Sequence, residues 1–255
     1  MTRFFLGLFT EPSTGVHAFT GSVVNLLRNL PQLHTFSLSM LGSGPSIEEF
    51  DEISTAVLPN LQRLVLSGLP GLFGVLLFLR APVLTRLHLI SPSELINYAH
   101  DITGVHFRHF IIVARPPLQL LELRDVAIPP DAYLHVFADL PDLRELRLHE
   151  SEITNHVLQR LEGQFGLCPH LQVLDLRWCN QITGSALVRI VQSRLPSRNE
   201  NRVDFISAIT VINCAFVGDQ AIIKLAGMTV CRLIIPDGDD QCRKWQSRVA
   251  FQLTT

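Results

Sequence analysis

The stretch PHLQVLDLRWCNQITGSALVRIV, residues 169–191, changes its hydrophobic period halfway along. In its first half, Leu174 and Leu176 alternate with polar residues, and such alternation predicts a β-strand. In its second half, apolar residues recur every three or four positions, as at Leu187 and Ile190, which predicts an amphipathic helix. A strand and a helix this short cannot bury a core by themselves. Whether the unit recurs therefore decides the fold.

The unit recurs along the chain as the motif L-x-x-L-x-L, in which other apolar residues can replace leucine. Eight copies begin at Leu33, Leu61, Leu84, Leu118, Leu143, Leu171, Ile206 and Val230. By subtraction, their starts are 28, 23, 34, 25, 28, 35 and 24 residues apart. A proline lies one or two residues upstream of six copies, at Pro31, Pro59, Pro82, Pro117, Pro141 and Pro169. Self-similarity of this kind is typical of a repeat protein.

The recurring unit predicts an α/β architecture. The fourth and sixth motif residues point to the same side of a strand, and the first reaches the same core from the bend before it. Between the strands, residues 46–57, 131–140, 155–165 and 219–227 have helical spacing. We therefore expect about eight repeats that stack their strands in parallel on a concave face, with the helices on the convex face.

The repeats also predict the domain organisation. We expect one elongated repeat domain over residues 22–238, in which each unit contacts only its neighbours. Residues 1–21 form an N-terminal segment, and residues 239–255 form a C-terminal cap or tail over the end of the core. The apolar residues 68–84 include two prolines and an arginine, so we expect a buried helix instead of the roughly 20 uninterrupted apolar residues of a membrane span.

Two copies of the unit carry a cysteine just after the strand. The stretches LDLRWCNQITGSALVRIV, residues 174–191, and ITVINCAFVGDQAIIKLA, residues 209–226, align Cys179 with Cys214. In these residues the chain resembles the cysteine-containing subtype of the leucine-rich-repeat family, and its proline punctuation is similar to that of fungal F-box proteins. The resemblance implies a leucine-rich-repeat solenoid, shaped like a horseshoe, whose concave face binds a protein partner.

The same resemblance implies a function, the recognition of substrates for an F-box-type ubiquitin ligase. In such a ligase an F-box joins the repeats to cullin-ligase subunits. No F-box pattern is visible in the sequence, so a stand-alone repeat scaffold without a ligase role is the alternative. A third possibility is a GTPase-activating accessory that acts through one projecting arginine.

The strand residues that alternate with the motif leucines are the candidate partner-binding residues. They are Arg86, His88, Glu122, Arg124, Arg147, His149, Asp175 and Arg177, followed by Trp178 at a strand exit. We expect them to be exposed, with one column formed by Arg124, His149 and Arg177 and a second by Glu122, Arg147 and Asp175. Arginine and tryptophan are enriched in protein-binding hot spots. The alternative is that these charges only solvate the sheet face and pair with each other.

Composition and motifs argue against other classes of function. The net charge is -2, with 21 basic and 23 acidic residues, which predicts neither a nucleic-acid nor a membrane-surface partner. No nucleophile elbow, phosphate loop or metal-binding spacing occurs, and His106 and His109 lack a third ligand nearby, so we expect no enzyme, cofactor or metal site. The 5 cysteines have no close pair, which favours reduced thiols and an intracellular protein.

Overall fold

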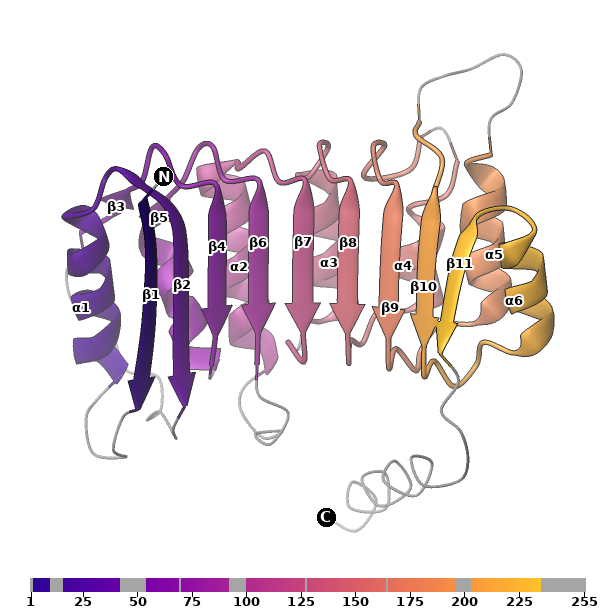
Figure 1. The fold of residues 1–255 in the computed structure, drawn as a ribbon, viewed down its shortest axis with the longest axis horizontal. Coiled ribbons are helices and arrows are strands. Elements are labelled where there is room, and N and C mark those ends of the chain that lie inside the picture. Colours follow the sequence, from indigo (N-terminus) through magenta and orange to yellow (C-terminus); the bar gives the residue numbers. More distant parts are fainter. Residues whose placement is uncertain are drawn as a thin grey trace, which may run out of the picture.

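The computed structural model describes residues 2–9, 16–41, 54–68, 70–91, 100–126, 128–163, 165–195 and 203–234. Over these residues the chain has an α/β fold with a 9-stranded parallel sheet (Figure 1). The strands lie in the sheet in the order β1 (Thr2–Phe9), β2 (Leu33–Leu41), β4 (Arg63–Ser67), β6 (Arg86–Ile90), β7 (Leu120–Arg124), β8 (Glu145–His149), β9 (Val173–Arg177), β10 (Ala208–Ile212) and β11 (Val230–Ile234). This order is also their order along the chain. Two short strands, β3 (Ala56–Val57) and β5 (Leu79–Arg80), form a separate parallel pair.

The helices form a second layer on one side of the large sheet. They are α1 (Val16–Arg28), the 3₁₀-helix η1 (Pro70–Phe78), α2 (His100–Ala114), α3 (Pro130–Ala138), α4 (Asn155–Gln159), α5 (Gly184–Ser193) and α6 (Asp219–Ala226). Each helix contacts the next one along the chain, from α1 to α6. In Figure 1 the strands lie in front of this layer, and none of the described helices crosses the front of the sheet. We call this uncovered side of the sheet the open face.

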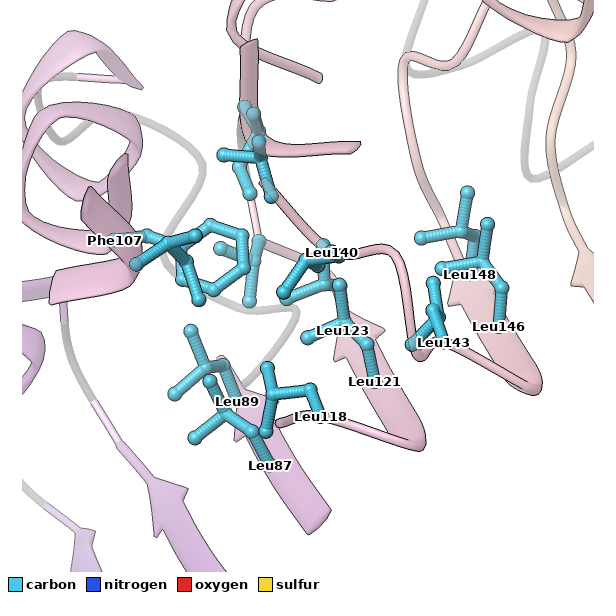
Figure 2. Packing of buried hydrophobic residues seen from close by; sticks show 14 of the residues in the cluster. Leu87, Leu89, Phe107, Leu118, Leu121, Leu123, Leu140, Leu143, Leu146 and Leu148 are labelled. Atoms are coloured by element: carbon cyan, nitrogen blue, oxygen red, sulfur yellow. The ribbon is translucent and has the colours of Figure 1, made fainter. Parts of the chain in front are cut away.

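The motif leucines form the core between the sheet and the helices. In the seven copies from residue 33 to residue 211, all three motif positions are buried. Figure 2 shows the leucines of β7 between those of β6 and β8, with Phe107 of α2 facing them. In the eighth copy Val230 is 61% exposed, because no further strand among the described residues packs beyond β11. The spacing in the sequence thus correctly predicts which side of the strand faces the core in these seven copies.

The first motif residue closes a turn before the strand, and the same bond recurs from copy to copy. The N–H of Leu143 donates to the carbonyl of Leu140 at 3.3 Å, and the N–H of Leu171 donates to Cys168 at 3.1 Å. Proline fits this turn because it fixes the backbone and the turn does not use its missing N–H. The upstream prolines therefore mark where each strand begins.

A second turn recurs where the strands end. The residue after each of β7, β8, β9 and β10 has a left-handed backbone, with φ between 51° and 54°; these residues are Asp125, Glu150, Trp178 and Asn213. The N–H of Glu150 donates to Arg177 at 2.8 Å, and the N–H of Trp178 donates to Ile212 at 2.8 Å. This conformation is uncommon for residues other than glycine. Its recurrence means that one geometry directs the chain from every one of these strands toward the helices.

Cysteine follows the left-handed residue in two of these turns, as the sequence predicts. The thiol of Cys179 donates to the carbonyl of Leu148 at 3.4 Å, and that of Cys214 donates to Leu176 at 3.7 Å. Both side chains are buried. They donate to carbonyls of the preceding strand and so act as buried spacers between the strands. Burial also raises the pKa of the Cys168 thiol to about 12.

The structure differs from the sequence-based expectations near the N-terminus and in the length of one helix. The sheet begins at Thr2, and the expected boundary between residues 21 and 22 falls inside α1. Phe4 stacks against Phe36 with ring centroids 6.2 Å apart, which ties β1 to β2. The helix expected over residues 155–165 ends at Gln159.

The remaining expectations concern the apolar segment and the C-terminus. Residues 68–84 contain the predicted buried helix, but it is a 3₁₀-helix, η1, that packs between α1 and α2. No helix in the described part of the chain is both long and apolar enough to span a membrane. Residues 239–255, expected as a cap or tail, lie outside the described residues.

Candidate functional site

The strand register arranges the candidate residues of the open face in rows that cross the strands. The central row consists of His88, Glu122, Arg147 and Asp175. The exit row, nearer the ends of the strands, consists of Arg124, His149 and Arg177. Neighbouring strands are about 4.8 Å apart, so side chains within a row can touch. These two rows contain the two columns of residues that the sequence predicts, and the register confirms both.

A short sequence element places the charges on this face. An acidic residue, a leucine and an arginine follow one another at residues 122–124, 145–147 and 175–177. Because side chains alternate along a strand, the leucine points into the core and both charged residues point to the open face. The arginine then contacts the carboxylate two positions before it. This contact is bidentate on β9, where Arg177 donates from Nε and Nη2 to the two Asp175 oxygens at 2.8 Å each.

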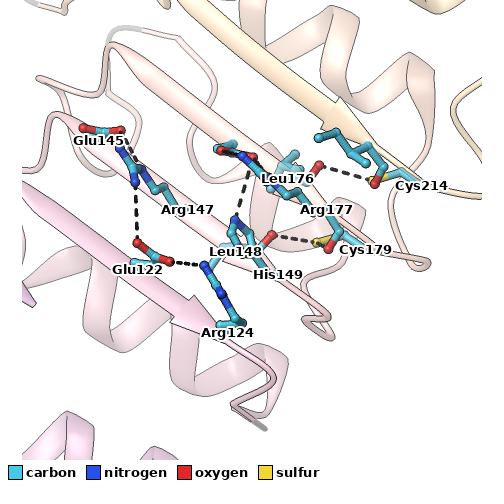
Figure 3. A network of polar contacts seen from close by, with 12 residues as sticks. Glu122, Arg124, Glu145, Arg147, Leu148, His149, Leu176, Arg177, Cys179 and Cys214 are labelled. Atoms are coloured by element: carbon cyan, nitrogen blue, oxygen red, sulfur yellow. Dashed lines mark hydrogen bonds and ion pairs between the residues drawn. The ribbon is translucent and has the colours of Figure 1, made fainter. Parts of the chain in front are cut away.

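The same contact occurs on β7 and β8. Arg124 Nη2 lies 2.9 Å from Glu122 Oε1, and Arg147 Nε lies 2.7 Å from Glu145 Oε1 (Figure 3). Glu145 was not among the residues that the sequence singled out as candidates. The repeated acid-leucine-arginine element is the signal that could have found it.

The element on β8 is displaced by two residues relative to its neighbours. Arg147 therefore lies in the central row between Glu122 and Asp175, instead of beside Arg124 and Arg177. Its Nη1 is 3.6 Å from Glu122 Oε2. Opposite charges on adjacent strands attract each other, whereas like charges directly opposite are destabilising. The displacement thus gives an alternation of sign across β7, β8 and β9.

The exposure of these residues corrects one expectation. The sequence predicts that all of them are exposed, but the side chains of His88, Glu122, His149 and Asp175 are only 6–11% exposed. Arginines contact the shorter acids from the same strand, as Arg177 does Asp175, and in one case also from the next strand, as Arg147 does Glu122. Arg86 is exposed and Trp178 is half-buried. The open face therefore consists of arginines above a layer of buried acids and histidines.

Glu122 is the centre of this buried layer. Its Oε2 lies 3.0 Å from His88 Nδ1, and its other oxygen accepts the hydrogen bond from Arg124. The hydrogen bond with His88 lowers the pKa of Glu122 to about 2, with a further contribution from Arg124 and against the effect of burial. The carboxylate therefore stays charged at neutral pH and holds the surrounding cations in place.

The surroundings of His149 favour its neutral form, whereas those of Glu122 favour the charged form. Burial lowers the pKa of His149, although Asp175, whose Oδ1 is 3.9 Å from His149 Nε2, acts against this shift. The hydrogen bonds with Asp175 raise the pKa of Arg177. At neutral pH the exit row thus contains two charged arginines on either side of a neutral histidine.

These shifts predict how stability depends on pH. In the unfolded chain His149 takes up a proton near pH 6.5, whereas burial lowers its pKa in the folded protein. Stability should therefore fall as the pH drops below about 6.5.

Glu122 contributes stability above its unfolded pKa of 4.5, and this contribution should disappear as the pH falls toward about 2. Urea titrations of the wild type and Glu122→Gln measure the second effect. The stability difference between them should shrink below pH 4.5, and a constant difference would contradict the assignment.

Other groups of titratable residues do not form a site in the described residues. His106 is buried and His109 is exposed on α2. In the part of the chain that the structure describes, no group of three or more His, Cys, Asp or Glu residues is placed to hold a metal ion. The expectation that the protein has no catalytic or cofactor site stays a prediction.

Comparisons with known proteins add no relative. No protein-family model matches the chain, and no curated protein matches it.

Proposed function

We propose that the chain is a leucine-rich-repeat solenoid of the cysteine-containing subtype and that its open face binds a protein partner. Three observations support the solenoid: the parallel strands follow chain order, the three motif residues are buried in copy after copy, and the same turns precede and follow the strands. The open face then corresponds to the concave face of such a solenoid. The fold that this proposal assumes does not itself specify a partner.

The observation that carries the binding role is the composition of the open face. Apart from Leu120 and Val173, the side chains there are charged or polar over β7, β8 and β9, and no described helix covers them. Arginine and tryptophan, present here as Arg124, Arg147, Arg177 and Trp178, are enriched among the residues that dominate protein–protein binding. Their supporting contacts hold the arginines in fixed positions, which reduces the entropy lost when a partner binds.

We further propose that the binding role is the recognition of substrates for an F-box-type ubiquitin ligase. In this role the chain performs no chemistry of its own. It holds a substrate while cullin-ligase subunits, recruited through an F-box, transfer ubiquitin. The protein would act in the cytoplasm or nucleus, where its cysteines remain reduced. A repeat scaffold without cullin-ligase partners is the competing role.

Charge reversal on the open face tests the binding role. Arg147→Glu and Arg177→Glu should each reduce partner capture by on the order of tenfold or more, because a central arginine of an interface contributes strongly to affinity. The measurement is affinity capture with quantitative mass spectrometry. Arg108→Glu is the matched control, since Arg108 is exposed on α2 in the helix layer.

The outcomes of this experiment separate the proposals. Equal capture by all variants, with unchanged circular dichroism, would refute binding through the open face. Recovery of cullin-ligase subunits with the wild type supports the ligase role. Capture that depends on the two arginines but never includes such subunits would favour the scaffold.

A further inference from the structure

The charges of the open face are separated by depth. The side chains of Arg124, Arg147 and Arg177 are 36–49% exposed, whereas those of Glu122 and Asp175 are 7–11% exposed. Arg124 and Arg177 extend outward past the buried carboxylates that hold them, whereas Arg147 is held by Glu145, which is 27% exposed. A molecule that approaches this face meets guanidinium groups first.

The arginines also outnumber the acids along the face. The open-face positions of the strands from β4 to β11 carry six arginines, at Arg63, Arg86, Arg124, Arg147, Arg177 and Arg232. The same positions carry three carboxylates, at Glu122, Glu145 and Asp175. Asp125 and Glu150, like Trp178, come one residue after their strands, at the edge of the face, and even with them the arginines outnumber the carboxylates six to five. The face is therefore positive in a chain whose net charge is -2.

From this arrangement we infer that the open face selects a partner segment rich in aspartate and glutamate. The inference rests on the proposed protein-binding function and names the partner chemistry. A guanidinium group has five N–H donors in a plane and binds carboxylates in a two-point geometry. Arg124 donates one of its Nη groups to Glu122, which leaves other donors for a partner.

The distribution of the arginines favours several carboxylates over a single phosphate group. The six arginines lie on six strands, β4, β6, β7, β8, β9 and β11. The three central ones are each bound to a carboxylate of the same strand, so they do not converge on one point. A peptide that crosses the strands covers about 3.3 Å per residue, and neighbouring strands are about 4.8 Å apart. Acidic side chains spread along such a peptide can meet successive arginines.

The buried acids have a clear role in this scheme. They hold the arginine side chains, which would otherwise lose conformational entropy on binding. The protein thus presents a positive face whose geometry is fixed before the partner arrives. Because the attraction involves exposed charges, it should weaken as salt concentration rises.

The test uses three labelled peptides of twelve residues with the full chain. One contains glutamate at every second position, one has glutamine at those positions, and one has glutamine with a single phosphoserine. In fluorescence anisotropy at low salt, the glutamate peptide should bind on the order of tenfold more tightly than the glutamine peptide. The triple variant Arg124→Gln, Arg147→Gln, Arg177→Gln should lose this preference, and Arg108→Gln should keep it.

Each contrary result has a definite meaning. Equal binding of the glutamate and glutamine peptides, or a preference that survives in the triple variant, would overturn the inference. If the phosphoserine peptide bound more tightly than the glutamate peptide, the open face would select a single phosphate group and not carboxylates spread along the partner. If partner capture depends on Arg177 but cross-linking places a neutral or basic segment on the open face, the proposed binding function stands and the acidic preference fails. Circular dichroism and thermal melting establish that the variants are folded.

Discussion

Replacing Leu146 with alanine should lower the free energy of unfolding by about 2–5 kcal/mol. Leu146 is fully buried in β8, at a position where its register neighbours are Leu121 of β7 and Leu174 of β9. Strands lie on both sides of it and hydrogen bonds fix their spacing, so the surroundings cannot collapse into the space that the side chain leaves. The lost burial and the remaining cavity both add to the cost.

A urea titration followed by circular dichroism measures this effect. The matched control is Ile223→Ala, because Ile223 is a large aliphatic residue that is 71% exposed on α6. The control should change stability by no more than about 0.5 kcal/mol, as is usual for a surface position. A loss below about 1 kcal/mol for Leu146→Ala would contradict a tightly packed ladder.

Replacing Arg194 with leucine should cost about 3–5 kcal/mol of stability. Arg194 follows α5 and is only 3% exposed. Its guanidinium donates to the carbonyls of Leu161 and Leu167 at 2.8 Å each and to that of Cys168 at 3.1 Å. The substitution leaves the carbonyls of Leu161 and Leu167 without this donor, whereas that of Cys168 keeps its hydrogen bond from the N–H of Leu171. Each such group costs about 1–3 kcal/mol, and part of this cost is relieved when water enters.

The conservative and the neighbouring variants make this prediction specific. Arg194→Lys should recover only part of the stability, because one ammonium group cannot match the planar fork that reaches three carbonyls. Arg189→Leu is the control on the same helix. Arg189 is exposed, and its ion pair with Glu162 at 3.3 Å should contribute at most about 1 kcal/mol. If Arg189→Leu destabilised the protein as much as Arg194→Leu, the buried contacts would not explain the effect.

The features that the sequence predicts well are those that depend on local spacing. The motif leucines identify the core side of strands β2 to β10, and the alternating residues give the columns of the open face. Both follow from the two-residue period of a strand, and a spacing pattern reports this period directly. The cysteines after β9 and β10 occupy equivalent places for the same reason, since their position relative to the strand is fixed by the repeat.

The features that the sequence does not predict depend on contacts between distant residues. Glu122 looks like a surface residue in the sequence, and its burial follows from His88 of β6 and Arg147 of β8, which lie beside it only after folding. Arg194 resembles an ordinary polar residue at a helix end, because the three carbonyls that it binds lie 26 to 33 positions away. In β1, Phe4 and Leu6 are in register with the motif residues Phe36 and Leu38 of β2, but apolar residues fill most of this strand, so a two-residue period does not stand out in the sequence.

The match between strand order and chain order has a consequence for biosynthesis. Every strand of the large sheet pairs with the next sheet strand along the chain, so no described sheet strand waits for a partner made much later. A ribosome extends a chain by about 5–20 residues per second, and one unit therefore emerges every few seconds. Each new unit meets a docking edge that the previous unit has already formed. We expect the protein to assemble progressively during translation, so that among the described sheet strands unpaired edges occur at β1 and at the growing end, where they must be protected from aggregation.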